Sequence, residues 1–223
     1  MFEALNALDT NIFLFLNGIY NDYFNEFMWI VTRSFTWVLI VVALLYVIFK
    51  KDWKQGIVIV IGLALVICLA DQLSSGLIKP LVERFRPTHN PLIQNLVHVV
   101  NGYRGGNYGF VSSHAANSFG AALFLALVFK RKAFSWTIFA WAIILSYSRI
   151  YLGVHYPGDI ICGAIVGLIC GFFVYYLYGW SIHHFTPLQR LNLEAFSMKD
   201  CNIMISSIVI TFIFIAILSI FLC

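Results

Sequence analysis

Three short clusters of basic, hydroxyl and imidazole side chains interrupt an otherwise very apolar chain. Their members are Lys79 and Arg86, then Val111-Ser112-Ser113-His114, then Ser148-Arg149 with His155 and Asp159. Charged side chains are costly next to lipid, so a chain that keeps them there uses them. Lys79, Arg86 and Arg149 supply three positive charges that can hold a phosphate, and two histidines and a carboxylate can carry out proton and phosphoryl chemistry.

The phosphate-binding part of this prediction has a physical basis in each residue type. Arg86 offers a planar fork for two phosphate oxygens, and Lys79 adds a compact charge. Ser112 and Ser113 lie where a helix is expected to begin, and a helix start favours an anion. Interfacial anchoring of the two cations and simple helix capping by the two serines are the alternative interpretations.

The two histidines suit acid–base and nucleophilic roles. His155 precedes Pro157, a favoured first residue of a helix, so Asp159 falls in the opening turn within reach of one imidazole nitrogen. The other nitrogen then keeps a lone pair for attack. His114 can donate a proton to a departing alcohol. The alternative is an amphipathic interfacial histidine. A metal site is not expected, because the three cations would repel a divalent ion.

The composition predicts an integral membrane protein. The chain has 223 residues, of which 61% are hydrophobic and 11% charged, against about 25% charged in soluble domains; the mean hydropathy is +0.87. The net charge of +4 is modest and its basic residues are clustered, so no nucleic-acid partner is expected. The five cysteines form no metal-ligand pattern and are interpreted as packing residues.

Apolar runs of about 20 residues predict an all-α fold, a bundle of six transmembrane helices. The expected spans are 27–49, 56–78, 114–129, 134–151, 158–178 and 202–222. Residues 5–16 are apolar but short, which predicts an interfacial N-terminal helix. Residues 1–178 would then form the phosphatase core, and residues 179–223 a cytoplasmic connection with the sixth span.

The charges of the loops predict how the chain is oriented in the membrane. Lysines and arginine in the loops at 50–54 and 130–132 place both loops on the cytoplasmic side. Alternation then places residues 79–113 and 152–157 outside, so all three clusters reach one face of the bilayer. A bacterial inner membrane with the site facing the periplasm is the expected location.

Three further features carry predictions. Arg84, Arg86 and Arg104 are basic on the outer side, against the usual bias, which indicates a local anionic ligand. Asp71 lies inside the second span, where a structural pair with a cation or hydroxyl of a neighbouring helix is favoured over catalysis, and Arg33 is one conceivable partner. Glycines at 163, 167 and 171 predict close helix packing within the bundle rather than a dimer seam.

The motifs K-x6-RP, Ser-x-His and SR-x5-H-x3-D, in that order, resemble the signature of the type 2 phosphatidic acid phosphatase superfamily over about residues 5–178. The resemblance implies a metal- and cofactor-free phosphatase. His155 would form a phosphohistidine, oriented by Asp159, and His114 would be the general acid. The phosphoryl oxygens would be held by the remaining motif residues, Lys79, Arg86, Ser112, Arg149 and a backbone amide near Ser113.

One cluster departs from the family. The usual Pro-Ser-Gly-His is Val111-Ser112-Ser113-His114 here. A side chain at position 113 stands where the backbone approaches phosphate, so Ser113 is expected to contribute either its amide or its hydroxyl.

The sequence therefore predicts a membrane phosphatase that hydrolyses a lipid phosphate or diphosphate at the outer, periplasmic face of the membrane through a phosphohistidine intermediate. Undecaprenyl diphosphate, a lipid A phosphate and phosphatidylglycerol phosphate are the candidate substrates. Phosphotransfer to another lipid and a non-catalytic anion transporter are the alternatives. The oligomeric state has no signature in the sequence.

Overall fold

The computed structural model describes residues 2–184 and 195–223, and within these ranges the chain is helical with an isolated bridge between Phe85 and Tyr108. The α-helices are α1 (Phe2–Asn17), α2 (Asp22–Val31), α3 (Val38–Lys51), α4 (Trp53–Asp71), α5 (Lys79–Val82), α6 (Ser113–Phe129), α7 (Lys132–Tyr151), α8 (Pro157–His184) and α9 (Met198–Leu222). The predicted all-α membrane architecture is confirmed.

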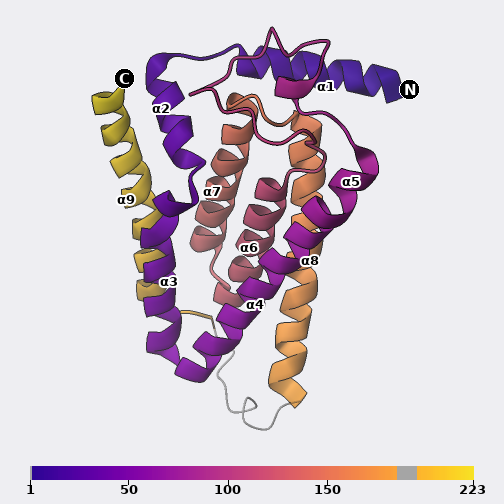
Figure 1. Ribbon diagram of the computed structural model, residues 1–223. Coiled ribbons are helices and arrows are strands. Elements are labelled where there is room, and N and C mark those ends of the chain that lie inside the picture. Colours follow the sequence, from indigo (N-terminus) through magenta and orange to yellow (C-terminus); the bar gives the residue numbers. More distant parts are fainter. Residues whose placement is uncertain (1, 185–194) are drawn as a thin grey trace.

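The long helices form a bundle with two distinct ends (Figure 1). At one end, here called the site end, α6 and α8 begin and α7 finishes, and α1 lies across it. The opposite, basic end carries the α3–α4 turn with Lys50 and the α6–α7 turn with Lys130. Five segments among the described residues are long and apolar enough to cross a membrane: Ser34–Lys51, Trp53–Val82, Lys132–Tyr151, Pro157–His184 and Met198–Leu222.

Helix α6 is shorter than these segments and occupies the middle of the bundle (Figure 1). Its 17 residues extend about 25 Å at 1.5 Å per residue. Side chains along its length are buried against α4, α7 and α8. Its limits agree with the expected 114–129. Helix α8 continues across residue 178 to His184, and the division of the chain there remains a prediction.

The prediction of one continuous helix over 27–49 is wrong. Helix α2 ends at Val31, Arg33 is extended, and a 3-10 turn, η1 (Ser34–Trp37), leads into α3. Side chains after the break satisfy the backbone carbonyls that it frees: the hydroxyl of Thr36 donates to Ile30 O at 2.6 Å and the indole of Trp37 to Val31 O at 3.0 Å. The apolar composition of this segment did not reveal these side-chain bonds.

The second span also changes its geometry near the site end. Helix α4 passes into a π-helix, η2 (Gln72–Ile78), and then into α5. The hydroxyl of Ser74 donates to Ala70 O at 2.7 Å, which satisfies a carbonyl where the helix widens. A π-helical turn shifts the helix face relative to a regular α-helix. The residue that follows it is Lys79, the first member of the first cluster.

Helices α6 and α8 are in backbone-to-backbone contact along a stripe of glycines. A Cβ added at Gly163, Gly167 or Gly171 would overlap a carbonyl oxygen of α6 or of the residue before it, those of Ser112, Ala116 and Gly120. The stripe therefore lies inside the bundle, as predicted, and it lets the two helix starts approach each other closely.

Gly167→Ala should lower stability, because the new methyl group would meet backbone atoms of Ala116 that cannot move independently of α6. Forced overpacking of this kind costs about 1–3 kcal/mol. The midpoint of thermal unfolding in detergent measures the effect. Gly179→Ala on the same helix is the matched control, since a Cβ there meets nothing within 4 Å. Equal midpoints for the two variants would contradict the close contact.

Candidate active site

Lys79 is held between two hydroxyl groups. Its ammonium donates to Ser75 Oγ and to Ser113 Oγ, each at 3.1 Å. Ser75 in turn donates to Asp71 Oδ1 at 3.3 Å. Asp71 therefore has a partner on its own helical segment, and the suggested pairing with Arg33 is wrong, because Arg33 stacks on Trp29 at 4.8 Å.

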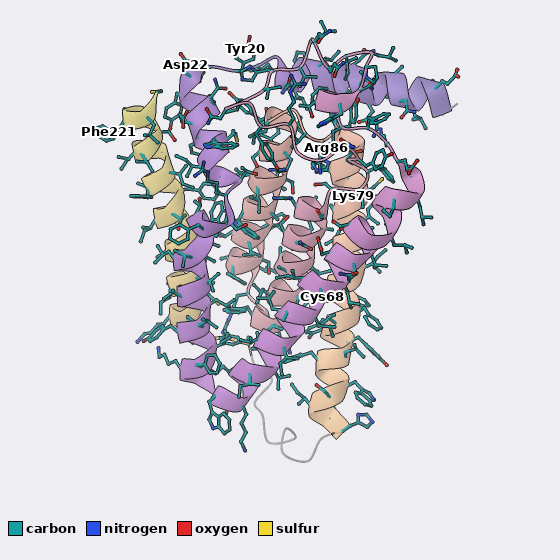
Figure 2. The ribbon with its side chains drawn as sticks, in the orientation of Figure 1. Tyr20, Asp22, Cys68, Lys79, Arg86 and Phe221 are labelled. Carbon is teal, nitrogen blue, oxygen red and sulfur yellow. The ribbon has the colours of Figure 1, made fainter. Side chains whose placement is uncertain are left out.

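Arg86 lies in an extended loop whose backbone is tied to Asn107, and its side chain points into the site end of the bundle (Figure 2). Its Nη1 donates to Val154 O and to His155 Nε2, both at 3.0 Å. Burial and the nearby charge of Arg149 lower the pKa of Arg86 from its usual value. Burial and the neighbouring positive charge thus both destabilise the charged form of this guanidinium.

Arg149, near the end of α7, is also buried. Its Nη1 donates to Thr32 Oγ1 at 2.6 Å and its Nη2 to Tyr103 OH at 3.1 Å. Burial alone would raise the pKa of Tyr103, yet the charge and hydrogen bond of Arg149 lower it. Sequence reasoning missed Thr32 and Tyr103, because neither belongs to a motif with chemical spacing.

The two arginines share a property that decides what this site can bind. Arg86 is 9% and Arg149 is 3% exposed. In the described part of the chain, neither has a carboxylate within ion-pair distance, and the Nε of each is buried without a hydrogen-bond partner. Buried charge without a counterion costs several kcal/mol. The pair is therefore suited to an anion from outside the chain.

His155 and Asp159 are completely enclosed by the protein and lie in contact. His155 Nδ1 is 3.3 Å from Asp159 Oδ2, which also accepts from the amide of Tyr156 at 3.0 Å. A guanidinium can only donate, so the contact with Arg86 requires that Nε2 carry a lone pair and Nδ1 the proton. Burial, then the charges of Arg86, Arg149 and Lys79, holds the pKa of His155 well below its usual value.

The start of α6 places the second cluster beside the third. Ser112 is the N-cap of α6, as the capping interpretation predicts: its Oγ accepts from Ala115 N at 3.4 Å. Its own amide donates to the carbonyl oxygen of Asp159 at 3.0 Å. His114, in the same first turn, lies within electrostatic range of His155, Arg86 and Arg149. The structure thus brings all eight predicted site residues to one end of the bundle.

Arg84 differs from the other arginines, because its guanidinium binds carboxylates of the protein itself. It donates to Asp159 Oδ1 at 2.9 Å and to Asp9 Oδ2 at 2.8 Å. The prediction that Arg84 serves an anionic ligand is therefore wrong for this residue. Arg104 donates weakly to Thr88 O at 3.4 Å.

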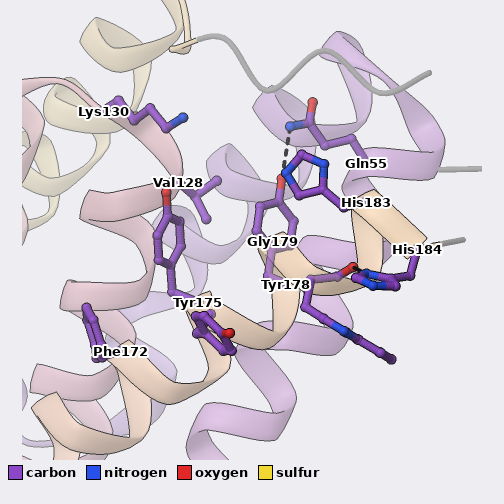
Figure 3. Close-up of a pocket in the computed structure, with 11 residues that line it drawn as sticks. Gln55, Val128, Lys130, Phe172, Tyr175, Tyr178, Gly179, His183 and His184 are labelled. Carbon is purple, nitrogen blue, oxygen red and sulfur yellow. Dashed lines mark hydrogen bonds between the residues drawn. The ribbon is translucent and has the colours of Figure 1, made fainter. Parts of the chain in front are cut away.

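A separate cavity of about 520 Å³ lies at the basic end, lined by Gln55, Tyr178, His183 and His184 among others (Figure 3). His183 and His184 end α8, 28 residues long, so they lie about 40 Å along the helix axis from Pro157. They are too distant to act with His155, as the sequence indicates. No group of three or more metal-ligating side chains is found among the described residues.

The family model of the PAP2 superfamily matches residues 56–183, which contain all three clusters. The chain belongs to this superfamily. The resemblance drawn from the motifs is confirmed, and the protein is a membrane phosphatase of the PAP2 type that acts on a lipid phosphate.

Curated relatives extend the match. The chain is 44% identical over 180 residues to a lipid A 4′-phosphatase of Bacteroides thetaiotaomicron, covering 79% of this chain and 80% of the relative. It is 43% identical over 182 residues to a lipid A 4′-phosphatase of Porphyromonas gingivalis, covering 80% and 77%. An undecaprenyl-diphosphatase of Sulfolobus acidocaldarius is 28% identical over 168 residues, covering 74% and 72%.

Solved PAP2-type structures have the same fold. LpxE of Aquifex aeolicus superimposes with a TM-score of 0.59 at 25% identity, covering 76% of this chain and 95% of that one. A transmembrane PAP2-type phosphatidylglycerolphosphate phosphatase from Bacillus subtilis gives the same TM-score and identity, covering 82% and 89%.

His155 of this PAP2 protein should remain neutral in mildly acidic solution. Its lowered pKa means that protonation begins only well below the usual value of about 6.5. Nitrogen-15 spectra of histidine-labelled protein in detergent, assigned by the signal lost in His155→Ala, should show the Nδ1–H tautomer at pH 6. A titration midpoint at or above 6.5 would contradict the buried, cation-lined environment.

Proposed function

We propose that this protein removes the 4′-phosphate of lipid A through a phosphohistidine on His155. The chemistry is supported above all by the two buried guanidiniums, Arg86 and Arg149, whose Nε atoms have no hydrogen-bond partner among the described residues. Beside them, the Nε2 lone pair of His155 accepts a hydrogen bond from Arg86, which a phosphoryl group can displace. A phosphoryl group would supply the missing oxygens to both. Fixed positive charge placed where oxyanion charge is shared is the main source of catalysis in phosphoryl transfer.

The choice of substrate is supported by the relatives. Two lipid A 4′-phosphatases are 44% and 43% identical to the chain, against 28% for the undecaprenyl-diphosphatase. Lipid A is accordingly favoured over undecaprenyl diphosphate and phosphatidylglycerol phosphate.

In the first step, Nε2 of His155 attacks phosphorus, and the bond between phosphorus and the leaving lipid oxygen breaks. Arg86 must release Nε2 and turn its Nη1 towards a phosphoryl oxygen, which keeps the charge in place while freeing the lone pair. Asp159 accepts a hydrogen bond from Nδ1–H and stabilises the positive charge that develops on the imidazole. His114 gives a proton to the departing alkoxide.

In the second step, water attacks the phosphorus of the phosphohistidine while His114 takes up the water's proton. The bond between Nε2 and phosphorus breaks, and inorganic phosphate leaves. Lys79, Arg149, Ser112 and Ser113 hold the phosphoryl oxygens in both steps. Ser113 can donate through its hydroxyl, since its Oγ already accepts from Lys79 and its proton remains available.

The membrane arrangement forms part of the same proposal. Six spans cross the bacterial inner membrane, with α6 as the shortest inside the bundle. Exposed leucines and phenylalanine on α1, Leu5, Leu8 and Phe15, support its position at the interface. Lysines at the basic end favour the cytoplasm, which directs the site end to the periplasm.

Incubation with phosphate-labelled lipid A should leave label on His155. Acid-labile, base-stable radioactivity is expected on the wild-type protein after rapid quenching and should be absent from His155→Ala. His184→Ala is the matched control, because this histidine lies at the other end of α8. Labelling and turnover equal to wild type in His155→Ala would overturn the assignment of the nucleophile.

Among lipid phosphates presented at equal mole fraction in detergent, lipid A should lose its 4′-phosphate at least tenfold faster than undecaprenyl diphosphate or phosphatidylglycerol phosphate release phosphate. Mass spectrometry of the products locates the lost group, and EDTA should leave the rate unchanged. Preferential hydrolysis of undecaprenyl diphosphate would refute the substrate assignment. A phosphorylated acceptor lipid among the products would identify phosphotransfer instead of hydrolysis.

A further inference from the structure

Arg84 forms a bridge between the N-terminal helix and the catalytic carboxylate. Its two terminal nitrogens bind Asp159 Oδ1 and Asp9 Oδ2 at 2.9 and 2.8 Å. The guanidinium also lies 4.0 Å above the ring of Tyr156, the residue after His155. Asp9, Arg84 and their contacts are called here the Asp9–Arg84 bridge.

The far end of the bridge is anchored at the start of α8. The second oxygen of Asp9, Oδ1, accepts from the amide of Gly158 at 2.8 Å. Asp9 therefore uses one oxygen for Arg84 and the other for the backbone next to Asp159. A Cβ added at Gly158 would lie 2.7 Å from Asp9 Oδ2, which shows how closely α1 is seated there.

The bridge completes the hydrogen bonding of Asp159. Oδ2 is used by His155 Nδ1 and the amide of Tyr156, and Oδ1 is used by Arg84. The carboxylate is 0% exposed with Arg84 in place, so Arg84, and not water, is the donor to Oδ1. Without Arg84, Oδ1 would lose this charged donor, and the group would be free to rotate towards another. Rotation would move Oδ2 away from Nδ1 and release the imidazole.

Its carboxylate partners also distinguish Arg84 from the arginines of the phosphate site. Each of its Nη atoms is occupied by a carboxylate, so its charge is already balanced within the protein. Arg86 and Arg149 are buried and have no such partners within residues 2–184 and 195–223. Arg84 therefore binds the oxygen of Asp159 that His155 does not contact, and its charge is not left over for a substrate anion.

We propose that Asp9 and Arg84 are positioning residues, which hold Asp159 so that the Nε2 lone pair of His155 faces the phosphorus. Seating of α1 on the bundle is then a requirement for the chemical step, although no residue of α1 belongs to a phosphatase motif. This inference rests on the proposed role of His155.

Arg84→Gln and Asp9→Asn should each lower kcat about 10- to 100-fold, the usual effect of removing a partner that orients a reactive group. KM for lipid A should change less than twofold, because neither residue touches substrate. The double variant should lose no more than the worse single variant, since both changes break one bridge. Arg131→Gln is the matched control and should keep both constants, because this arginine lies at the basic end, just before α7, where its Nε donates to Phe196 O.

Chemical rescue provides a measurement that would not change if Arg84 had a purely structural role. A cavity of about 540 Å³, lined by Arg84, Asn90 and Tyr156 among others, lies beside the bridge. Guanidinium at millimolar concentration should restore part of kcat to Arg84→Ala, and sodium chloride at equal ionic strength should not.

The outcomes discriminate clearly. A raised KM with unchanged kcat in Arg84→Gln would overturn the proposal and make Arg84 a substrate ligand, and additive losses in the double variant would show that the two residues act separately. If Arg84→Gln fails to fold, the isosteric variant Asp9→Asn tests the proposal. A lowered kcat with an unchanged KM in that variant supports it, and a raised KM with an unchanged kcat overturns it. Absence of phosphate release by the wild-type protein would count against the proposed substrate and not against the bridge.

Discussion

The close contact between α6 and α8 is the constraint on which the site depends. Where two helices meet through glycines, their backbones approach without intervening side chains, and their first turns can share hydrogen bonds. The amide of Ser112 consequently donates to the carbonyl of Asp159. This joins the second and third clusters, whose residues are far apart along the chain, into one structure. A wider spacing of the helices would break this hydrogen bond and move the start of α6, with His114, away from the start of α8.

Electrostatics then divides the arginines into two kinds. Arg84 is neutralised by Asp9 and Asp159, and it binds the carboxylate whose other oxygen contacts His155. Arg86 and Arg149 are buried without a carboxylate partner among the described residues. Without a ligand, these two buried charges have no counterion in that part of the chain, so the site favours a dianionic group. Burial, together with the same charges, lowers the pKa of His155 and favours its neutral form. In the proposed mechanism this is the form that attacks, so anion binding and nucleophilicity would have a common physical origin.

Irregular backbone is concentrated towards the site end of the bundle. The break after Val31 and the π-helix before Lys79 would be unfavourable against lipid, where unpaired backbone groups have no water to bind. Here the freed carbonyls are satisfied by Thr36, Trp37 and Ser74. Thr32, the residue that caps α2 at this break, accepts a hydrogen bond from the guanidinium of Arg149.

The sequence by itself determined the class of protein, the helical limits of α6 and α7, and the motif residues of the site. Long apolar runs and charged clusters at fixed spacing follow directly from lipid solvation and phosphate chemistry, and both are local in sequence. The tertiary structure decided the break between α2 and α3, the partner of Asp71, and the role of Arg84. Each of these depends on hydrogen bonds or burial set by three-dimensional packing, and no spacing rule encodes such contacts. Asp9 illustrates the difference: in the sequence it is one carboxylate in an amphipathic helix, and only the fold brings it to Arg84.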